Sequence, residues 1–203
     1  QNIVMQDWKL LREEAVKMVV DKLREDDIIV STTGMISREL FEYREAKGQG
    51  HAHDFLTVGS MGHASQIALG IALHKPSRRV IVFDGDGALL MHMGGMAIIG
   101  DYCPKNLVHI VFNNGAHDSV GGQPTVGQKI DVEAIAKAVG YKDVVSVDTQ
   151  ESLMCAMNHV NHSVLEGVAL INVNVRKGNR KDLGRPTTTP IENKEALMKE
   201  LAK

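Results

Sequence analysis

The spacing of apolar residues predicts helices and strands that alternate along the chain. Leu11, Ala15 and Val19 recur at four-residue steps, which indicates an amphipathic helix over residues 8–24. Further helices are expected over 37–46, 64–73, 131–139, 149–164 and 192–201, and in a Met-rich stretch that follows residue 87 and ends near residue 100. Short runs that are almost entirely apolar predict strands at 28–30, 54–58, 79–83, 107–112, 143–147 and 168–175.

Apolar strands that alternate with helices are typical of a parallel sheet covered on both faces. We therefore expect a three-layer α/β/α fold with a five- or six-stranded, mainly parallel sheet. Residues 1–203 are expected to form one domain, in which 176–203 make a basic, turn-rich tail and a terminal helix. The chain begins at Gln1 without an initiator Met, which suggests that it is part of a longer protein.

Glycine-rich turns follow four of the predicted strands. They are Thr33-Gly34, Gly59-Ser60-Met61-Gly62, Gly85-Asp86-Gly87 and Asn113-Asn114-Gly115. Right-handed crossovers bring the carboxyl ends of parallel strands to one edge of a sheet, and ligands bind at that edge. We therefore expect these four turns to gather around one binding site.

Asp86 and Asn114 carry the chemistry of this edge. Each follows a strand and one helix separates them, so the two side chains converge if those strands are neighbours. Carboxylate and amide oxygens suit Mg²⁺ or Ca²⁺ rather than zinc, and Mg²⁺ prefers a few protein oxygens together with phosphate. Taken separately, Gly-Asp-Gly and Asn-Asn-Gly are common turns, and Asp84 is interpreted as a turn or cap residue. Taken together, they favour a diphosphate held by a metal and by the amide groups of the helix that Gly87 opens.

Composition excludes several classes of function. The chain has 23 Lys and Arg against 25 Asp and Glu, a net charge of −2, which argues against a nucleic-acid or membrane-surface partner. No apolar run approaches the roughly 20 residues of a membrane span. Cys103 and Cys155 lie too far apart in the sequence to suggest a disulfide framework, which suits the cytoplasm.

Gly85-Asp86-Gly87, followed 25 residues later by Asn113-Asn114, resembles the motif of thiamine-diphosphate-dependent enzymes. The resemblance implies that Asp86, the Asn114 side chain and the Ala116 carbonyl bind Mg²⁺. It implies that Gly87 and Ala88 lie against the diphosphate of the cofactor. Further candidates for cofactor binding are Thr33, Gly34, Gly85 and Ser60. By the same resemblance, Gly59 contacts the aminopyrimidine ring and Met61 forces the cofactor into its bent shape.

Three longer blocks, at residues 55–64, 114–125 and 180–190, resemble the decarboxylases of this family that act on phosphonopyruvate. The likeness covers nearly the whole chain but only the diphosphate-binding half of such an enzyme. It implies a carboxy-lyase that forms phosphonoacetaldehyde and CO₂ and that is inactive as the isolated domain. It also implies a partner domain or subunit that binds the pyrimidine and carries the activating Glu, in a homo-oligomer.

A small anionic 2-oxoacid substrate needs cationic or hydrogen-bonding groups. His117, Ser119 and Gln123 follow the metal loop and are the candidates for substrate binding or catalysis, although His117 could equally serve the turn alone. The tail arginines Arg180 and Arg185 could bind a phosphonate, but a solvated surface is the favoured interpretation for both.

Two other functions remain open from the sequence. The first is the β subunit of a sulfopyruvate decarboxylase, which is similar in size and works with a separate chain. The second is a non-catalytic module that binds a nucleotide diphosphate. The turn Gly59-Ser60-Met61-Gly62 argues against the second, because a nucleotide binder would not require it.

Overall fold

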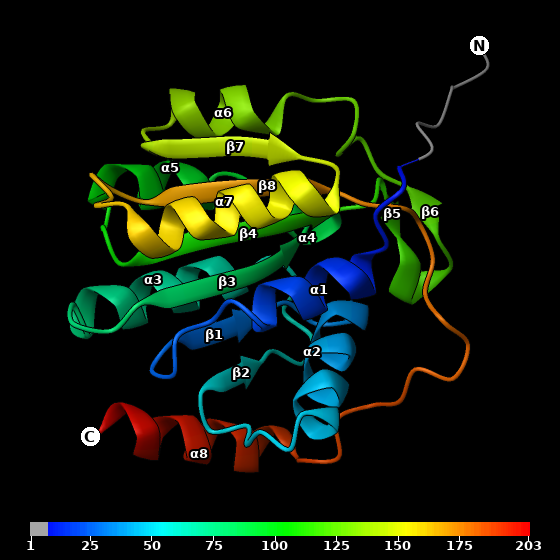
Figure 1. The fold of residues 1–203 in the computed structure, drawn as a ribbon, viewed down its shortest axis with the longest axis vertical. Helices are drawn as coiled ribbons and strands as arrows, with labels where there is room; N and C mark the ends of the chain where they lie inside the picture. Colours follow the sequence, from blue (N-terminus) through cyan, green and yellow to red (C-terminus); the bar gives the residue numbers. More distant parts are fainter. Residues whose placement is uncertain (1–7) are drawn as a thin grey trace.

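A computed structural model describes residues 8–203 and shows six parallel strands in one sheet (Figure 1). The strand order is β2-β1-β3-β4-β8-β7. The strands are β1 (Ile28–Ser31), β2 (Asp54–Leu56), β3 (Val80–Gly85), β4 (Leu107–Asn113), β7 (Asp143–Val147) and β8 (Ala169–Asn174). The expected fold class is confirmed, with six strands.

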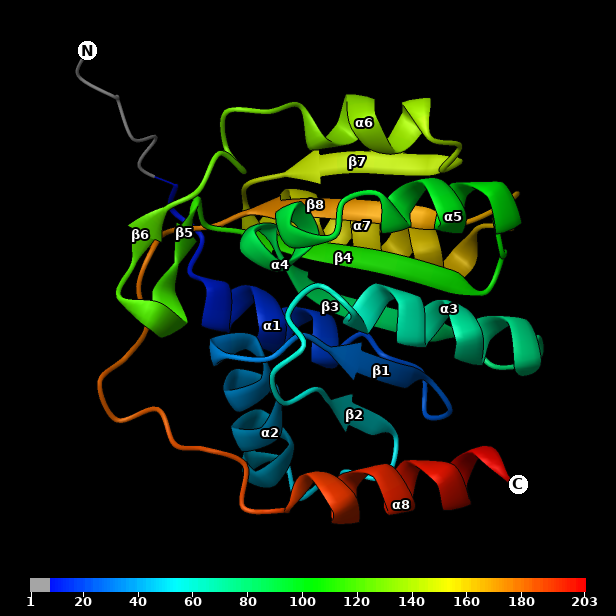
Figure 2. The same ribbon diagram turned by 180° about the vertical axis from the view of Figure 1, so that it is seen from behind.

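Helices cover both faces of the sheet. The face seen in Figure 1 carries α1 (Arg12–Val20), α2 (Met35–Ala46) and α7 (Gln150–His162). The opposite face, seen in Figure 2, carries α3 (Ala64–His74), α4 (Asp86–Met91), α5 (Gly95–Tyr102) and α6 (Val132–Ala138). The last helix, α8 (Pro190–Leu201), lies beside β2 at the sheet edge.

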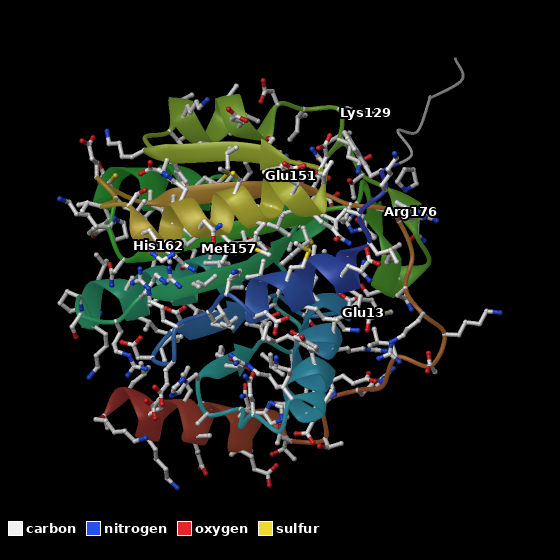
Figure 3. All side chains as sticks on the ribbon, in the orientation of Figure 1. Glu13, Lys129, Glu151, Met157, His162 and Arg176 are labelled. Carbon is white, nitrogen blue, oxygen red and sulfur yellow. The ribbon has the colours of Figure 1, made fainter. Side chains whose placement is uncertain are left out.

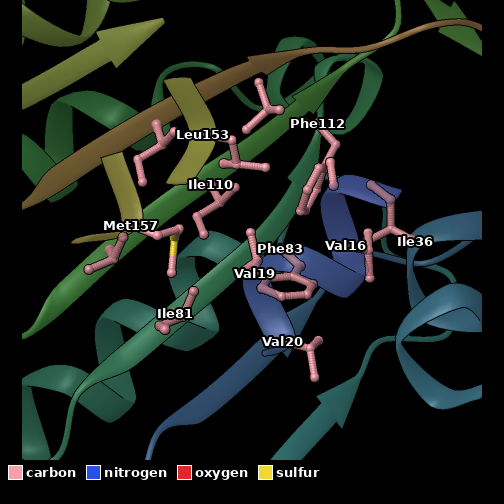
Figure 4. Packing of buried hydrophobic residues seen from close by; sticks show 14 of the residues in the cluster. Val16, Val19, Val20, Ile36, Ile81, Phe83, Ile110, Phe112, Leu153 and Met157 are labelled. Atoms are coloured by element: carbon pink, nitrogen blue, oxygen red, sulfur yellow. The ribbon is translucent and has the colours of Figure 1, made fainter. Parts of the chain in front are cut away.

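Alternating side chains of the central strands build two hydrophobic cores. Ile81 and Phe83 of β3 point towards α1 and α7, whereas Val80 and Val82 point towards the other helical layer. Figure 4 shows the first core, in which Phe83 meets Phe112 of β4 edge-on with ring centroids 5.3 Å apart. Because both faces of these strands are buried, their sequence is almost entirely apolar, and this made them recognisable.

Several predicted elements have different limits in the structure. The helix expected over residues 8–24 extends only over 12–20, and the Met-rich helix is divided into α4 and α5. A small hairpin of β5 (Ala116–His117) and β6 (Gln123–Pro124), with the 3₁₀ turn η1 (Asp118–Val120) between them, was not predicted. Two-residue strands are too short to show a hydrophobic period, so the pattern gave no signal for this hairpin.

The interpretation of Asp84 as a turn or cap residue is wrong. Asp84 lies within β3, is 1% exposed, and its Oδ2 lies within hydrogen-bond distance of Nε2 of His109 on β4, at 2.9 Å. The other ring nitrogen of His109 lies 3.0 Å from the Tyr141 hydroxyl. Burial, together with the charge of Asp84, raises the pKa of Tyr141. A partner on the neighbouring strand thus allows a carboxylate inside the sheet.

The tail between β8 and α8 runs along the side of the molecule and is held by ion pairs (Figure 1). Arg180 contacts Glu13 at 3.1 Å and Glu42 at 2.5 Å. Figure 3 shows Glu13 on α1 near the path of this tail. Within residues 8–203, no helix has the length and apolar character needed to cross a bilayer.

Candidate active site

Asp86 and Asn114 meet where β3 and β4 end. The two strands pair in parallel, so the first residue of α4 and the residue after β4 emerge side by side. Oδ1 of Asp86 accepts the backbone N–H of Asn114 at 3.3 Å, and Oδ2 accepts the hydroxyl of Thr125. The Asp86 carboxylate therefore contacts the backbone of Asn114, and both residues line one cavity.

The Asp86 carboxylate is 2% exposed. Burial raises the pKa of Asp86, while the hydrogen bonds from Thr125 and Asn114 and the charge of His117 act in the opposite direction. Within residues 8–203 no ion pair with a basic side chain joins it. A divalent cation would supply the missing positive charge, since buried carboxylates are stable when they are paired or coordinate a metal.

The side-chain amide of Asn114 is held in one orientation. Its Nδ2 donates to Oδ2 of Asp118 at 2.7 Å, and its Oδ1 accepts the backbone N–H of Ala116 at 3.0 Å. An amide oxygen has two lone pairs, so Oδ1 keeps one acceptor site for a further ligand. The two hydrogen bonds therefore fix the orientation of an oxygen in the residue whose backbone contacts Asp86.

A buried charge network holds Asp118 in turn. Arg12 of α1 donates from Nη1 to Oδ2 of Asp118 at 2.8 Å, and the N–H of Gly178 donates to the same oxygen at 3.0 Å. Arg12 also binds both carboxylate oxygens of Glu39, from Nε at 3.0 Å and from Nη2 at 2.9 Å. The side chains of Arg12, Glu39 and Asp118 are 3%, 1% and 7% exposed. The loop of residues 114–118 is thus connected to α1, α2 and the tail.

Sequence reasoning missed this network, because its members lie 27 and 106 residues apart. One local signal was available. Arg12 stands at helical spacing with the buried Ala15, Val16 and Val19, so a charged residue falls on the buried face of α1.

A cavity of about 50 Å³ opens beside Asp86. It is lined by Arg12, Thr32, Thr33, Met35, Ile36, Met61, Gly85, Asp86, Gly87, Ala88, Phe112, Asn114, Ala116, His117, Asp118 and Ser119. The hydroxyl of Thr32 is buried here and has no hydrogen-bond partner among residues 8–203. An unpaired buried hydroxyl is costly, so a ligand oxygen at this point would be stabilised. The residues present therefore fit an anionic group bound together with a divalent cation.

Two glycines allow the loops to approach α4 closely. A Cβ atom at Gly87 would lie 2.6 Å from Nδ1 of His117 and 3.2 Å from Cε of Met61. Gly62, with φ of +92°, leaves no room for a Cβ atom either, because it would lie 2.8 Å from the carbonyl of Ala88. The turn after β2 and the hairpin loop therefore both pack against the first turn of α4.

The structure brings most of the predicted site residues to this cavity. Met61, His117 and Ser119 line it together with the residues around Asp86 and Asn114. Gly34 lies just beside it, where a Cβ atom would be 3.4 Å from Cβ of Ser119. Three candidates lie outside the cavity: Gly59 and Ser60 on the exposed turn after β2, and Gln123 on the exposed strand β6. Thr32, Thr125 and Arg12 are site residues that the sequence did not single out.

Comparison with known proteins identifies the domain. The family model of the thiamine pyrophosphate enzyme C-terminal TPP-binding domain matches residues 32–173, which include strands β3 and β4 and the residues Asp86 and Asn114. The chain belongs to this family. Thiamine pyrophosphate is another name for thiamine diphosphate, so the family resemblance is confirmed.

Relatives of this TPP-binding domain include decarboxylases. It is 40% identical over 181 residues to a phosphonopyruvate decarboxylase from Streptomyces viridochromogenes, which corresponds to 89% of this chain and 44% of that protein. It is 37% identical over 141 residues to the sulfopyruvate decarboxylase subunit beta of Methanocaldococcus jannaschii, 69% of this chain and 72% of that subunit. The chain thus spans less than half the length of the phosphonopyruvate decarboxylase.

Solved structures share the fold of the TPP-binding domain. Benzoylformate decarboxylase from Polynucleobacter necessarius superposes with a TM-score of 0.69 at 18% identity, over 89% of this chain and 36% of that one. At this identity the likeness is one of fold alone.

Proposed function

We propose that this chain is the diphosphate- and Mg²⁺-binding half of a thiamine-diphosphate-dependent decarboxylase whose substrate is phosphonopyruvate. The observation that carries the proposal is the pairing of Asp86 with Asn114 at the end of two adjacent parallel strands. The 40% identity to a phosphonopyruvate decarboxylase supports the choice of substrate. The products would be phosphonoacetaldehyde and CO₂.

Magnesium would be held by oxygens of three residues. These are the carboxylate of Asp86, Oδ1 of Asn114 and the backbone carbonyl of Ala116, and phosphate oxygens would complete the coordination. Thr32 and Thr33 would donate hydroxyl hydrogen bonds to the diphosphate, and Gly85, Gly87 and Ala88, which line the same cavity, would lie against it.

When bound, thiamine diphosphate supplies the electron sink that decarboxylation of a 2-oxoacid requires. Met61, from the turn after β2, would support the bent cofactor, with Gly59 and Ser60 reaching the pyrimidine from the same turn. His117 and Ser119 would bind the substrate, and a ring nitrogen of His117 would hold or deliver a proton. Gly59 and Ser60 lie outside the cavity but belong to the same turn as Met61, which lines it. Gln123 is left out of this assignment because it lies on the exposed strand β6 and neither of its neighbours in the sequence lines the cavity.

The other half of the site would come from a partner. A pyrimidine-binding domain or subunit that carries the activating Glu would cover the edge at which Asp86 and Asn114 lie, within a homo-oligomer. We expect no turnover from residues 1–203 alone. Decarboxylation by the homogeneous isolated chain would contradict this expectation.

Sulfopyruvate decarboxylase is the second candidate. It is favoured by the 37% identity to a beta subunit of which this chain covers 72%. If this chain is such a beta subunit, its partner would be a separate chain.

The proposal is tested by Asp86→Ala in the assembled enzyme. Removal of the one anionic metal ligand should abolish Mg²⁺-dependent binding of thiamine diphosphate, measured by titration calorimetry with ADP as the comparison ligand. Asp101→Ala is the matched control, because Asp101 is exposed on α5 and away from the cavity. Unchanged cofactor affinity in Asp86→Ala would refute the metal assignment, and a preference for ADP would refute the thiamine assignment.

A further inference from the structure

A second hollow adjoins the cavity at Asp86. This cleft has a volume of about 470 Å³ and shares Thr33, Met61 and Ser119 with the smaller cavity. Its walls come from the first turns of α2, the turn after β2, the 3₁₀ turn η1 and the end of the tail. A ligand in the cleft would therefore lie directly beside a cofactor bound at Asp86.

The cleft carries positive charge that the protein does not neutralise. Arg38 and Arg185 line it, and no Asp or Glu does. Within residues 8–203 neither arginine has a carboxylate partner, whereas Arg12, Arg44, Arg78, Arg79 and Arg180 all form ion pairs. Two guanidinium groups without a counter-charge are suited to an anionic ligand, because Arg binds tetrahedral and planar oxyanions with paired hydrogen bonds.

The tail is fixed so that Arg185 reaches the cleft. Arg180 anchors it to Glu13 and Glu42, and the N–H of Gly184 donates to the same Glu42 at 3.1 Å. The side chain of Leu183 is buried between these points. The sequence did not distinguish the two tail arginines, but the structure does. Arg180 anchors the tail through ion pairs, whereas Arg185 lines the cleft and has no carboxylate partner among residues 8–203.

Hydroxyl groups add hydrogen-bond donors where the cleft adjoins the smaller cavity. Ser119 and Thr33 line both hollows, and a Cβ atom at Gly34 would lie 3.4 Å from Oγ of Ser119. A short substrate could thus place its reacting carbon near Ser119 while its far end points towards the arginines.

From this geometry we infer that the cleft binds the tetrahedral oxyanion at carbon 3 of the 2-oxoacid substrate, through Arg38 and Arg185. The inference rests on the proposed function and adds the substrate subsite to it. A phosphonate, like a phosphate, can carry a second negative charge near neutral pH, whereas a sulfonate carries one. Two unpaired arginines therefore match a phosphonate better than a sulfonate.

The test uses the assembled enzyme with Arg38→Gln and Arg185→Gln, and with Lys181→Gln as the matched control. Lys181 lies exposed on the same tail but does not line the cleft. For each protein, kcat/KM is measured with phosphonopyruvate, sulfopyruvate and pyruvate, which lacks the oxyanion at carbon 3. Calorimetry with thiamine diphosphate and Mg²⁺ and the thermal midpoint are measured alongside.

We expect each arginine substitution to lower the preference for phosphonopyruvate over pyruvate by about 10- to 100-fold, which is typical of a lost hydrogen bond to a charged group. The control should keep the wild-type preference. A larger loss of kcat/KM with sulfopyruvate than with phosphonopyruvate would support the oxyanion subsite but identify the sulfonate as its ligand. An unchanged preference, or an equal loss on all three acids, would overturn the subsite. Failure of the wild-type enzyme to bind thiamine diphosphate would instead overturn the proposed function.

Discussion

Replacement of Arg12 by Met tests the buried charge network that Arg12 forms with Glu39 and Asp118. Methionine keeps the apolar stem of Arg12 and removes its guanidinium. Asp118 would retain two donors, Asn114 and Gly178, whereas Glu39 would retain no hydrogen bond from residues 8–203. Removal of one partner from a buried ion pair costs about 3–5 kcal/mol. For a chain of this length, such a loss lowers the melting temperature by roughly 6–20 °C.

The loss of stability in Arg12→Met should be greater at higher pH. Burial raises the pKa of Glu39 above its ordinary value of 4.5, Arg12 counteracts this, and the nearby carboxylates of Glu13 and Asp118 raise it further. Without Arg12 the folded-state pKa rises more. Between pH 4.5 and that raised pKa the folded variant binds a proton that the unfolded chain has released, so its stability falls as the pH rises. The destabilisation should therefore be smaller near pH 5 than near pH 8.

Urea unfolding followed by circular dichroism at both pH values measures this effect. Lys17→Met is the matched control on the same helix, because the Lys17–Glu13 pair is 43% exposed at Lys17 and should contribute less than about 0.5 kcal/mol. The double variant Arg12→Met/Glu39→Met should recover most of the loss, since an apolar pair of similar volume replaces the ion pair. A loss below about 1 kcal/mol at pH 8, or one that grows on acidification, would refute this reasoning.

Two further substitutions probe the walls of the site. Thr32→Val removes the unpaired buried hydroxyl at constant shape. It should raise the free energy of unfolding by about 1 kcal/mol and weaken the binding of thiamine diphosphate. A lower stability together with unchanged affinity would contradict the proposed role of Thr32 in cofactor binding. Gly62→Ala places a Cβ atom 2.8 Å from the Ala88 carbonyl at a positive φ and should destabilise the fold by about 1–3 kcal/mol in thermal unfolding. Gly70→Ala, in the middle of α3 with open space around it, is the control and should stabilise by about 0.5–1 kcal/mol; equal effects of the two would argue against the close approach.

The parts of the fold that the sequence revealed are those in which a local pattern has a single physical cause. Strands buried on both faces must be apolar, and residues that follow adjacent parallel strands must share an edge, so the sheet and the placement of Asp86 beside Asn114 could be predicted. Asp84 was misread because its partner, His109, lies on another strand and is recognisable only once the pairing of β3 with β4 is known.

The charge network was hidden for a similar reason. Arg12, Glu39 and Asp118 come from three separate elements, and no spacing rule connects them. The β5–β6 hairpin escaped because its strands are too short for a periodic pattern. What local patterns miss, therefore, is long-range polar pairing and the short loops that depend on it.

The hydrogen bonds from Arg12 and Gly178 to Asp118 determine which segments a truncated or transplanted form of this domain must keep. Arg12 reaches it from the opening helix and Gly178 from the segment that leaves the last strand, and the backbone of Leu11 and Arg176 joins the same two segments as a parallel bridge. A shortened version that starts after α1 would keep the Gly-Asp-Gly and Asn-Asn motifs intact and still lose the guanidinium beneath them. The motifs alone are therefore a poor guide to the smallest piece of this protein that keeps the surroundings of Asp86 and Asn114 intact.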